Sequence, residues 1–274
     1  MERLNLRRNT KHIFHQTSER SNLYRKRKMN QQLKELYETY YSELLEKKNL
    51  LPEDVSSPLF MRVFDEYETA NKKILIVGQE THSWCDKLGS HNPQQLLDEY
   101  EKFELGQKVC YGKKYEEGIL RSLNSPFWNF SRRFFVNINY PEQERTRENR
   151  LKKGFLWTNI SKIDVGGATP CDEVNLINKS GFELLRKEVE IVRPDIVLFI
   201  TGMDYKDEMQ DYLNLHFTDV FTTECEKTSI YQLNHSDKSF PKNTFKISHP
   251  RYLYGTRTHN IILDELLKIK EQKI

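Results

Sequence analysis

The sequence has little alanine, few cysteines and no long apolar run. Alanine occurs only at Ala70 and Ala168, which accounts for an apolar content of 37% in a chain that is still rich in Leu, Ile and Phe. A full hydrophobic core is therefore possible. The longest apolar runs, at 74–77 and 196–200, are far shorter than the ~18 residues of a membrane span. The N-terminus begins Met-Glu-Arg without an apolar stretch, so we expect a cytoplasmic protein with no secretory signal and no membrane association.

The cysteines and the common cofactor motifs give no sign of a bound metal or cofactor. No C-x-x-C pair occurs, so the thiols are expected to be structural and reduced. The sequence also contains no P-loop, dinucleotide-binding, G-x-S-x-G or H-E-x-x-H motif. Three aspartates that follow expected strands lack the spacing of a metal site: Asp86, Asp164 and Asp204.

Positive charge is concentrated at the N-terminus. The formal net charge is only +3, but residues 1–28 contain nine basic and two acidic residues, and the remaining 246 residues sum to −4. A uniformly basic surface that coats nucleic acid is therefore excluded, and polyanion binding would need a local patch and a specific groove. We expect residues 1–28 to form a solvated, partly disordered tail, with the basic run at 25–28 exposed to solvent.

Strand and helix patterns alternate along the chain. Four short apolar runs are typical of buried strands, at 73–78, 154–159, 195–200 and 244–248. Helical spacing is found at 29–49, 93–104, 115–135, 174–192, 204–214 and 257–271. Residues 217–233 have the pattern of a hairpin-like excursion.

This alternation predicts an α/β fold, because parallel strands need helical crossovers that cover both faces of the sheet. We expect a three-layer α/β/α sandwich around a short, mainly parallel four-stranded sheet. An N-terminal extension at 1–52, a basic tail plus an amphipathic helix, would precede the α/β domain at 53–274. Function in such folds lies at the carboxyl ends of the strands.

Polar residues follow the expected strands directly, and their order resembles the uracil-DNA glycosylase superfamily. Gly78-Gln79-Glu80-Thr81-His82 is similar to the family's Gly-Gln-Asp-Pro-Tyr motif, and Asn159 occupies the place of its strand-end asparagine. His249-Pro250-Arg251-Tyr252-Leu253 is similar to His-Pro-Ser-Pro-Leu, and Ser125-Pro126-Phe127 to a Pro-Phe element. The resemblance covers roughly residues 70–270, and the N-terminal ~50 residues have no counterpart in it.

The resemblance implies a DNA glycosylase that hydrolyses the N-glycosidic bond of uracil or a related damaged base during base excision repair. Its catalytic residues would be Glu80, a carboxylate beneath the sugar, and His249, a neutral donor to the departing base. Asn159 would read the base edge, Gln79 would contact the base, and Phe127 would stack on it.

The partner implied is single- or double-stranded DNA with its base extruded. Leu253 would fill the vacated space in the duplex, with Arg251 and Arg257 near phosphates.

The first motif departs from the family pattern. Glu80 and Thr81 replace the family's aspartate and proline. The carboxylate therefore reaches about 1.5 Å further and the turn is less rigid. His82 replaces a tyrosine that blocks a 5-methyl group, which weakens the exclusion of thymine.

Each candidate also has a structural interpretation. Glu80 would cap a following helix, Asn159 would satisfy strand-end backbone groups, and His249 would be a turn residue. Phe127 would belong to the core, leaving Trp84 and Tyr111 as competitors for stacking. At the level of function, the alternatives are a catalytically inactive nucleic-acid or nucleotide-binding module and an enzyme acting on a free nucleoside or other small glycoside.

Overall fold

The computed structural model describes residues 2–111, 114–117, 124–202, 205–223, 228–235 and 238–271; side chains are described from residue 20 on, excluding 109–117 and 270–271. The strands are β1 Ile74–Gly78, β2 Lys108–Tyr111, β3 Lys114–Glu117, β4 Phe155–Asn159, β5 Ile196–Phe199, β6 Leu215–Thr222, β7 Ser229–His235 and β8 Asn243–Ile247. The helices are α1 Glu2–Glu46, α2 Asp65–Thr69, α3 Pro93–Phe103, α5 Pro126–Asn139, α6 Arg147–Leu151, α7 Asp172–Ile177, α8 Lys179–Val192, α9 Lys206–Asp211, α10 Pro250–Gly255 and α11 His259–Glu271.

The main sheet has six strands in the order β4-β1-β5-β8-β7-β6, so the expected four-stranded sheet is wrong in strand number. The four apolar runs form its parallel part, β4-β1-β5-β8. The hairpin β6–β7 extends the sheet antiparallel to β8, with Ile230 opposite Ile247. Its outer strand β6 is half exposed, so it lacks the continuous apolar pattern that identifies a strand buried on both faces.

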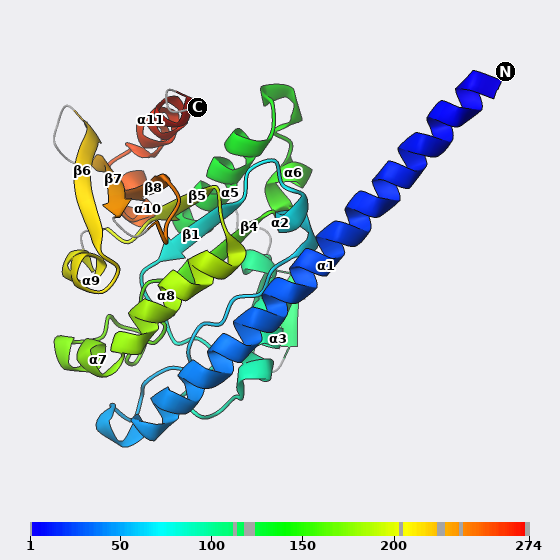
Figure 1. Cartoon of the computed structure of the whole chain (residues 1–274). Coiled ribbons are helices and arrows are strands. Elements are labelled where there is room, and N and C mark those ends of the chain that lie inside the picture. The colour runs from blue at the N-terminus through cyan, green and yellow to red at the C-terminus, as the bar shows by residue number, and fades with distance from the viewer. Residues whose placement is uncertain are drawn as a thin grey trace.

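Helices lie on both sides of the sheet, as expected for the α/β class (Figure 1). Helix α8 lies on one side with α1 packed across it, and α5 lies on the other side with α10 and α11. The sheet centre is apolar on both faces, because Ile74–Val77 of β1 are all fully buried. Among the described residues, no helix is long and apolar enough to cross a membrane.

Helix α1 runs from residue 2 to residue 46, so the expected disordered tail is wrong for the described residues 2–28. Residues 1–49 contain neither Pro nor Gly, so nothing in the sequence interrupts the helix. Leu33 and Tyr37 in its second half belong to the same buried cluster as β1. Its N-terminal part projects from the body (Figure 1).

Three other helix boundaries differ from the sequence expectation. Within the range 115–135 expected as one helix, residues 114–117 form β3, residues 118–123 lie outside the described residues, and α5 begins at Pro126, where proline fits the first helical turn. The pattern at 174–192 is divided into α7 and α8 at Asn178. The helix expected at 204–214 is shortened to α9, and Asp204 lies outside the described residues.

Candidate functional site

The carboxyl ends of the parallel strands define the candidate site. The chain leaves β1 for β4 on one side and continues through β5 and β8 on the other, so the strand order reverses beside β1. In open α/β sheets, ligands bind outside the carboxyl ends at this reversal. The segments that follow β1 and β5 meet here, because Gln79 Nε2 donates to the carbonyl oxygen of Thr201 at 3.0 Å.

Glu80 lies at this reversal and is held by a tyrosine. The Tyr205 hydroxyl donates to Glu80 Oε2 at 3.1 Å. Burial and the nearby Glu80 carboxylate raise the pKa of Tyr205 well above its ordinary value, so the phenol keeps its proton and remains a donor. No helix begins at Glu80; the next, α3, begins at Pro93 and is capped by Asn92. The helix-cap interpretation of Glu80 is therefore wrong.

The loop after Glu80 is fastened by Asp164, which is fully buried. Asp164 Oδ2 accepts hydrogen bonds from the Thr81 hydroxyl and, at 2.7 Å, from the Ser83 amide. Its Oδ1 accepts from the Gly167 amide at 2.7 Å. Asp164 thus joins the loops that follow β1 and β4, and it supplies the rigidity that Thr81 would lack in place of a proline. The sequence alone indicates no such role for Asp164.

No metal site accompanies these carboxylates in the part of the chain that the structure describes. There, no group of three His, Cys, Asp or Glu side chains is arranged to hold an ion. The carboxyl group of Asp164 is instead occupied by the donors of the two loops.

Asn159 lies at the end of β4 with its amide fixed in orientation. Its Oδ1 accepts from Trp157 Nε1 at 3.0 Å, and its Nδ2 is buried without a hydrogen-bond partner. A Cβ at Gly78 would clash with Asn159 Oδ1 and lie 3.3 Å from the Phe127 ring, so glycine is required where β1 ends. A buried, unpaired amide is costly unless a ligand accepts from it, which favours a recognition role over backbone capping.

Phe127 lies near two other rings of the site, those of Trp157 and His249. Its ring centroid lies 6.4 Å from the His249 ring and 6.1 Å from the Trp157 ring. Phe127 is half buried, which is compatible with both a core and a stacking role. Of its competitors, Trp84 packs edge-on against Trp157, and the side chain of Tyr111 lies outside the described residues.

His249 caps α10 and is fixed in one tautomer. Its Nδ1 accepts from the Arg251 amide at 3.2 Å, so in the neutral ring the proton is on Nε2. The ring is half buried, and a Cβ at Gly202 would lie 3.8 Å from His249 Cβ. The helix-cap role and a donor role are compatible because they use different nitrogens.

The residues of α10 change the expected contact with DNA. Leu253 is fully buried in the hydrophobic core, so its expected role as a duplex wedge is wrong in this structure. Tyr252 beside it is 49% exposed. Arg251 and Arg257 are exposed, as contact with phosphates would require.

Five residues predicted for the site lie near the carboxyl edge of the parallel strands: Gln79, Glu80, Asn159, Phe127 and His249. Their supporting partners Trp157, Tyr205 and Asp164 are not predicted from the sequence. No sequence motif marks them, since the contacts of Tyr205 and Asp164 join segments that are 81 to 125 residues apart.

Comparisons with known proteins identify no relative. No protein-family model matches the chain, and the searches of curated proteins and of solved structures return no match.

Proposed function

We propose that the protein hydrolyses the N-glycosidic bond of uracil or a related damaged base in DNA. The main observation that supports this proposal is that separate segments of the chain converge at one edge of the sheet. The Phe127 ring lies 6.4 Å from the His249 ring between centroids, Phe127 and Asn159 both lie beside Gly78, and Glu80 lies at the neighbouring strand reversal. This arrangement provides a base-reading amide, an aromatic ring, a hydrogen-bond donor and a carboxylate.

The chemistry requires each of these groups. As the C1′–N bond breaks, its electron pair moves to the base and positive charge develops on the sugar. Glu80 stabilises that charge and orients the water whose oxygen bonds to C1′, while His249 Nε2–H donates a hydrogen bond to the base oxygen that becomes anionic. The proton that the water loses, leaving a hydroxyl on the sugar, neutralises the departing base anion. The unpaired Nδ2 of Asn159 donates to a carbonyl such as uracil O4, and an amino group in that place would leave it unsatisfied.

Contact with the DNA would come from α10, the helix that His249 caps, and from the turn after it, which contains Arg257. Arg251 and Arg257 supply charge for phosphates. Tyr252, with its exposed ring, replaces Leu253 as the side chain that fills the space left by an extruded base. The site would then accept a flipped nucleotide from either single- or double-stranded DNA.

One observation favours a second candidate, a nucleic-acid-binding module of the same fold without catalysis. The carboxylate of Glu80 is one methylene longer than the aspartate of the family that the sequence resembles. One of its oxygens is already bonded to Tyr205. A displacement of ~1 Å can reduce a rate about a hundredfold, so the carboxylate could bind the sugar without accelerating hydrolysis.

Excision from uracil-containing single- and double-stranded oligonucleotides tests the proposal. The wild type should release uracil, and Glu80→Gln and His249→Ala should each lower the rate roughly 10²–10³-fold. Glu190→Gln and His216→Ala, at exposed positions elsewhere, should retain the wild-type rate. Binding without excision by the wild type would establish the inactive module, and equal rates in all variants would refute the residue assignments.

A further inference from the structure

Helix α1 carries an uninterrupted basic stretch over residues 20–34. This stretch holds six cationic residues and no Asp or Glu: Arg20, Arg25, Lys26, Arg27, Lys28 and Lys34. Residues seven apart lie on nearly the same side of a helix, so Arg20, Arg27 and Lys34 form one row about 21 Å long. Leu33 and Tyr37, on a neighbouring side, are buried against the body, so the row flanks the line of contact.

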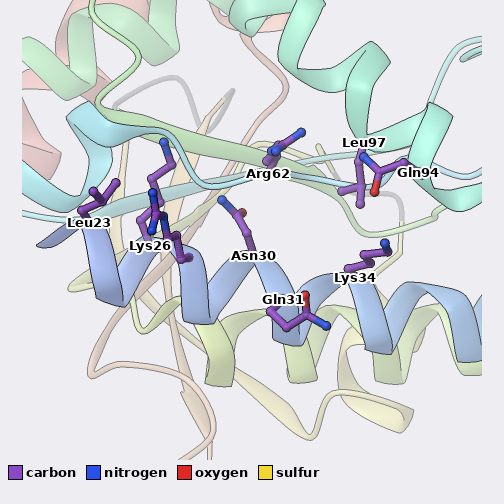
Figure 2. A pocket seen from close by; sticks show the side chains of 9 residues that line it. Leu23, Lys26, Asn30, Gln31, Lys34, Arg62, Gln94 and Leu97 are labelled. Atoms are coloured by element: carbon purple, nitrogen blue, oxygen red, sulfur yellow. The ribbon is translucent and has the colours of Figure 1, made fainter.

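A cavity of about 520 Å³ lies in the angle between this row and the body (Figure 2). Its walls come from α1, from Arg62 and from α3, and they contain four cations, three amides and no acid. The lining residues are Leu23, Lys26, Arg27, Asn30, Gln31, Lys34, Arg62, Gln94 and Leu97.

Part of this charge is held in place and part is unpaired. Lys26 pairs with Asp65 at 2.7 Å, and Arg62 pairs with Glu101 at 2.9 Å and with Asp98 at 3.4 Å. Lys34 lies 3.9 Å from Glu38, a weak contact. The six cations of the stretch, together with Arg62, thus face four acids, which leaves a net charge of +3. Arg20 and Arg27 are exposed and have no ion-pair partner among the described side chains.

We propose that the Arg20–Arg27–Lys34 row and its cavity bind the phosphate backbone of a nucleic acid. A row of about 21 Å with repeated cations matches a polyanion rather than a single phosphate group. A lipid surface is a poorer match, because an interfacial helix needs an apolar face and the exposed large apolar side chains of this stretch are only Leu23 and Tyr24. Binding to backbone alone carries no sequence or damage preference.

This surface is remote from the candidate site. Lys26 contacts Asp65 at the start of α2, and α2 leads into the amino end of β1, whereas the site lies at the carboxyl ends of the strands. The N-terminal part of α1 projects away from the body (Figure 1). The surface is thus an anchor that holds nucleic acid independently of base excision, and the proposal stands whether or not the site is catalytic.

Two double variants of α1 test it. Arg20→Gln/Arg27→Gln removes two charges from the row. Arg25→Gln/Lys28→Gln removes two exposed, unpaired charges from the solvent side of the same helix and is the matched control. Glutamine retains helix propensity, and Tm and circular dichroism verify folding. The probe is a fluorescent 20-bp duplex with no damaged base, titrated at several salt concentrations.

The row variant should raise the Kd about tenfold or more at 0.1 M salt and lower the slope of log K against log salt by roughly two. The control should change the Kd less than threefold, and Arg20→Lys/Arg27→Lys should restore wild-type binding. Equal weakening by both glutamine variants would overturn the proposal, as would unchanged binding in the row variant. Wild-type binding to 3:1 phosphatidylcholine–phosphatidylserine vesicles with none to the duplex would overturn it in favour of a lipid surface.

Discussion

The carboxyl edge of the sheet and the cavity side of α1 use polar side chains in opposite ways. At the edge, polar atoms are buried and bonded to one another, as when Asp164 accepts from two loops and Tyr205 donates to Glu80. On α1, Arg20 and Arg27 are exposed and unpaired. Fixed, desolvated groups suit recognition of one small moiety, whereas exposed cations suit a sequence-independent polyanion. Recognition of a small group and attraction of a polyanion thus belong to separate parts of the chain.

The largest expected effect is on stability, and it comes from removing the buried ion pair that connects these two regions. Glu188 on α8 pairs with Lys162 Nζ at 2.6 Å and accepts from the Tyr37 hydroxyl of α1 at 2.8 Å, and Lys162 and Glu188 are fully buried. Glu188→Ala leaves the Lys162 ammonium without its partner. We expect a loss of about 3–5 kcal/mol in the free energy of unfolding, measured by urea denaturation.

Glu190→Ala, at an exposed position on the same helix, is the control and should change stability by less than about 0.5 kcal/mol. A small loss for Glu188→Ala as well would contradict a single cooperative unit that includes α1 and the strand ends. A biphasic transition would show that α1 unfolds separately.

The parallel part of the sheet could be predicted because its strands are continuous apolar runs. The hairpin strands β6 and β7 were not counted in the sheet, since half-exposed strands carry a mixed pattern. The helical state of residues 2–28 is not evident from their positive charge, although they contain neither Pro nor Gly to interrupt a helix.

The position of a candidate residue at the sheet edge could be predicted where its place after a strand was sufficient, as for Asn159 and His249. It was not predicted where the role depends on a distant partner, as for Asp164 with Ser83. Leu253 shows a further limit. A motif position gives a residue type but not its exposure, and this leucine is buried in the core while Tyr252 is exposed.

An intermediate effect is expected from loosening the site alone. Asp164→Asn replaces one of the two acceptor oxygens with an amide NH2 group, which can only donate. Either the acceptor of Thr81 and Ser83 or the acceptor of Gly167 is lost, so the connection between the two loops is weakened. If the protein excises uracil as proposed, the rate should fall about 10–100-fold while the Kd for an undamaged duplex stays unchanged. The Arg20→Gln/Arg27→Gln variant should instead raise the Kd for the undamaged duplex and leave the excision rate of bound substrate unchanged.

Hydrogen exchange of the Ser83 and Gly167 amides gives a readout that does not depend on activity. At least one of the two amides should lose protection in Asp164→Asn, because only one acceptor oxygen remains, and both should keep it in Asp207→Asn, an exposed control. If both retained protection, Asp164 would not be what holds the loops. If duplex binding weakened along with excision, the two regions would not act separately.

The smallest expected effect concerns Tyr252. Tyr252→Ala removes a half-exposed ring, so stability should change little. Excision from duplex should fall roughly three- to tenfold, because the space left by the extruded base is no longer filled, whereas excision from single strands should be unaffected. Tyr24→Ala, on α1 at 69% exposure, is the matched control and should leave the duplex-to-single-strand ratio unchanged. Equal losses on both substrates would mean that Tyr252 only contacts the backbone. Helix α10 would then bind phosphates, as α1 is proposed to do, rather than recognise the extruded base.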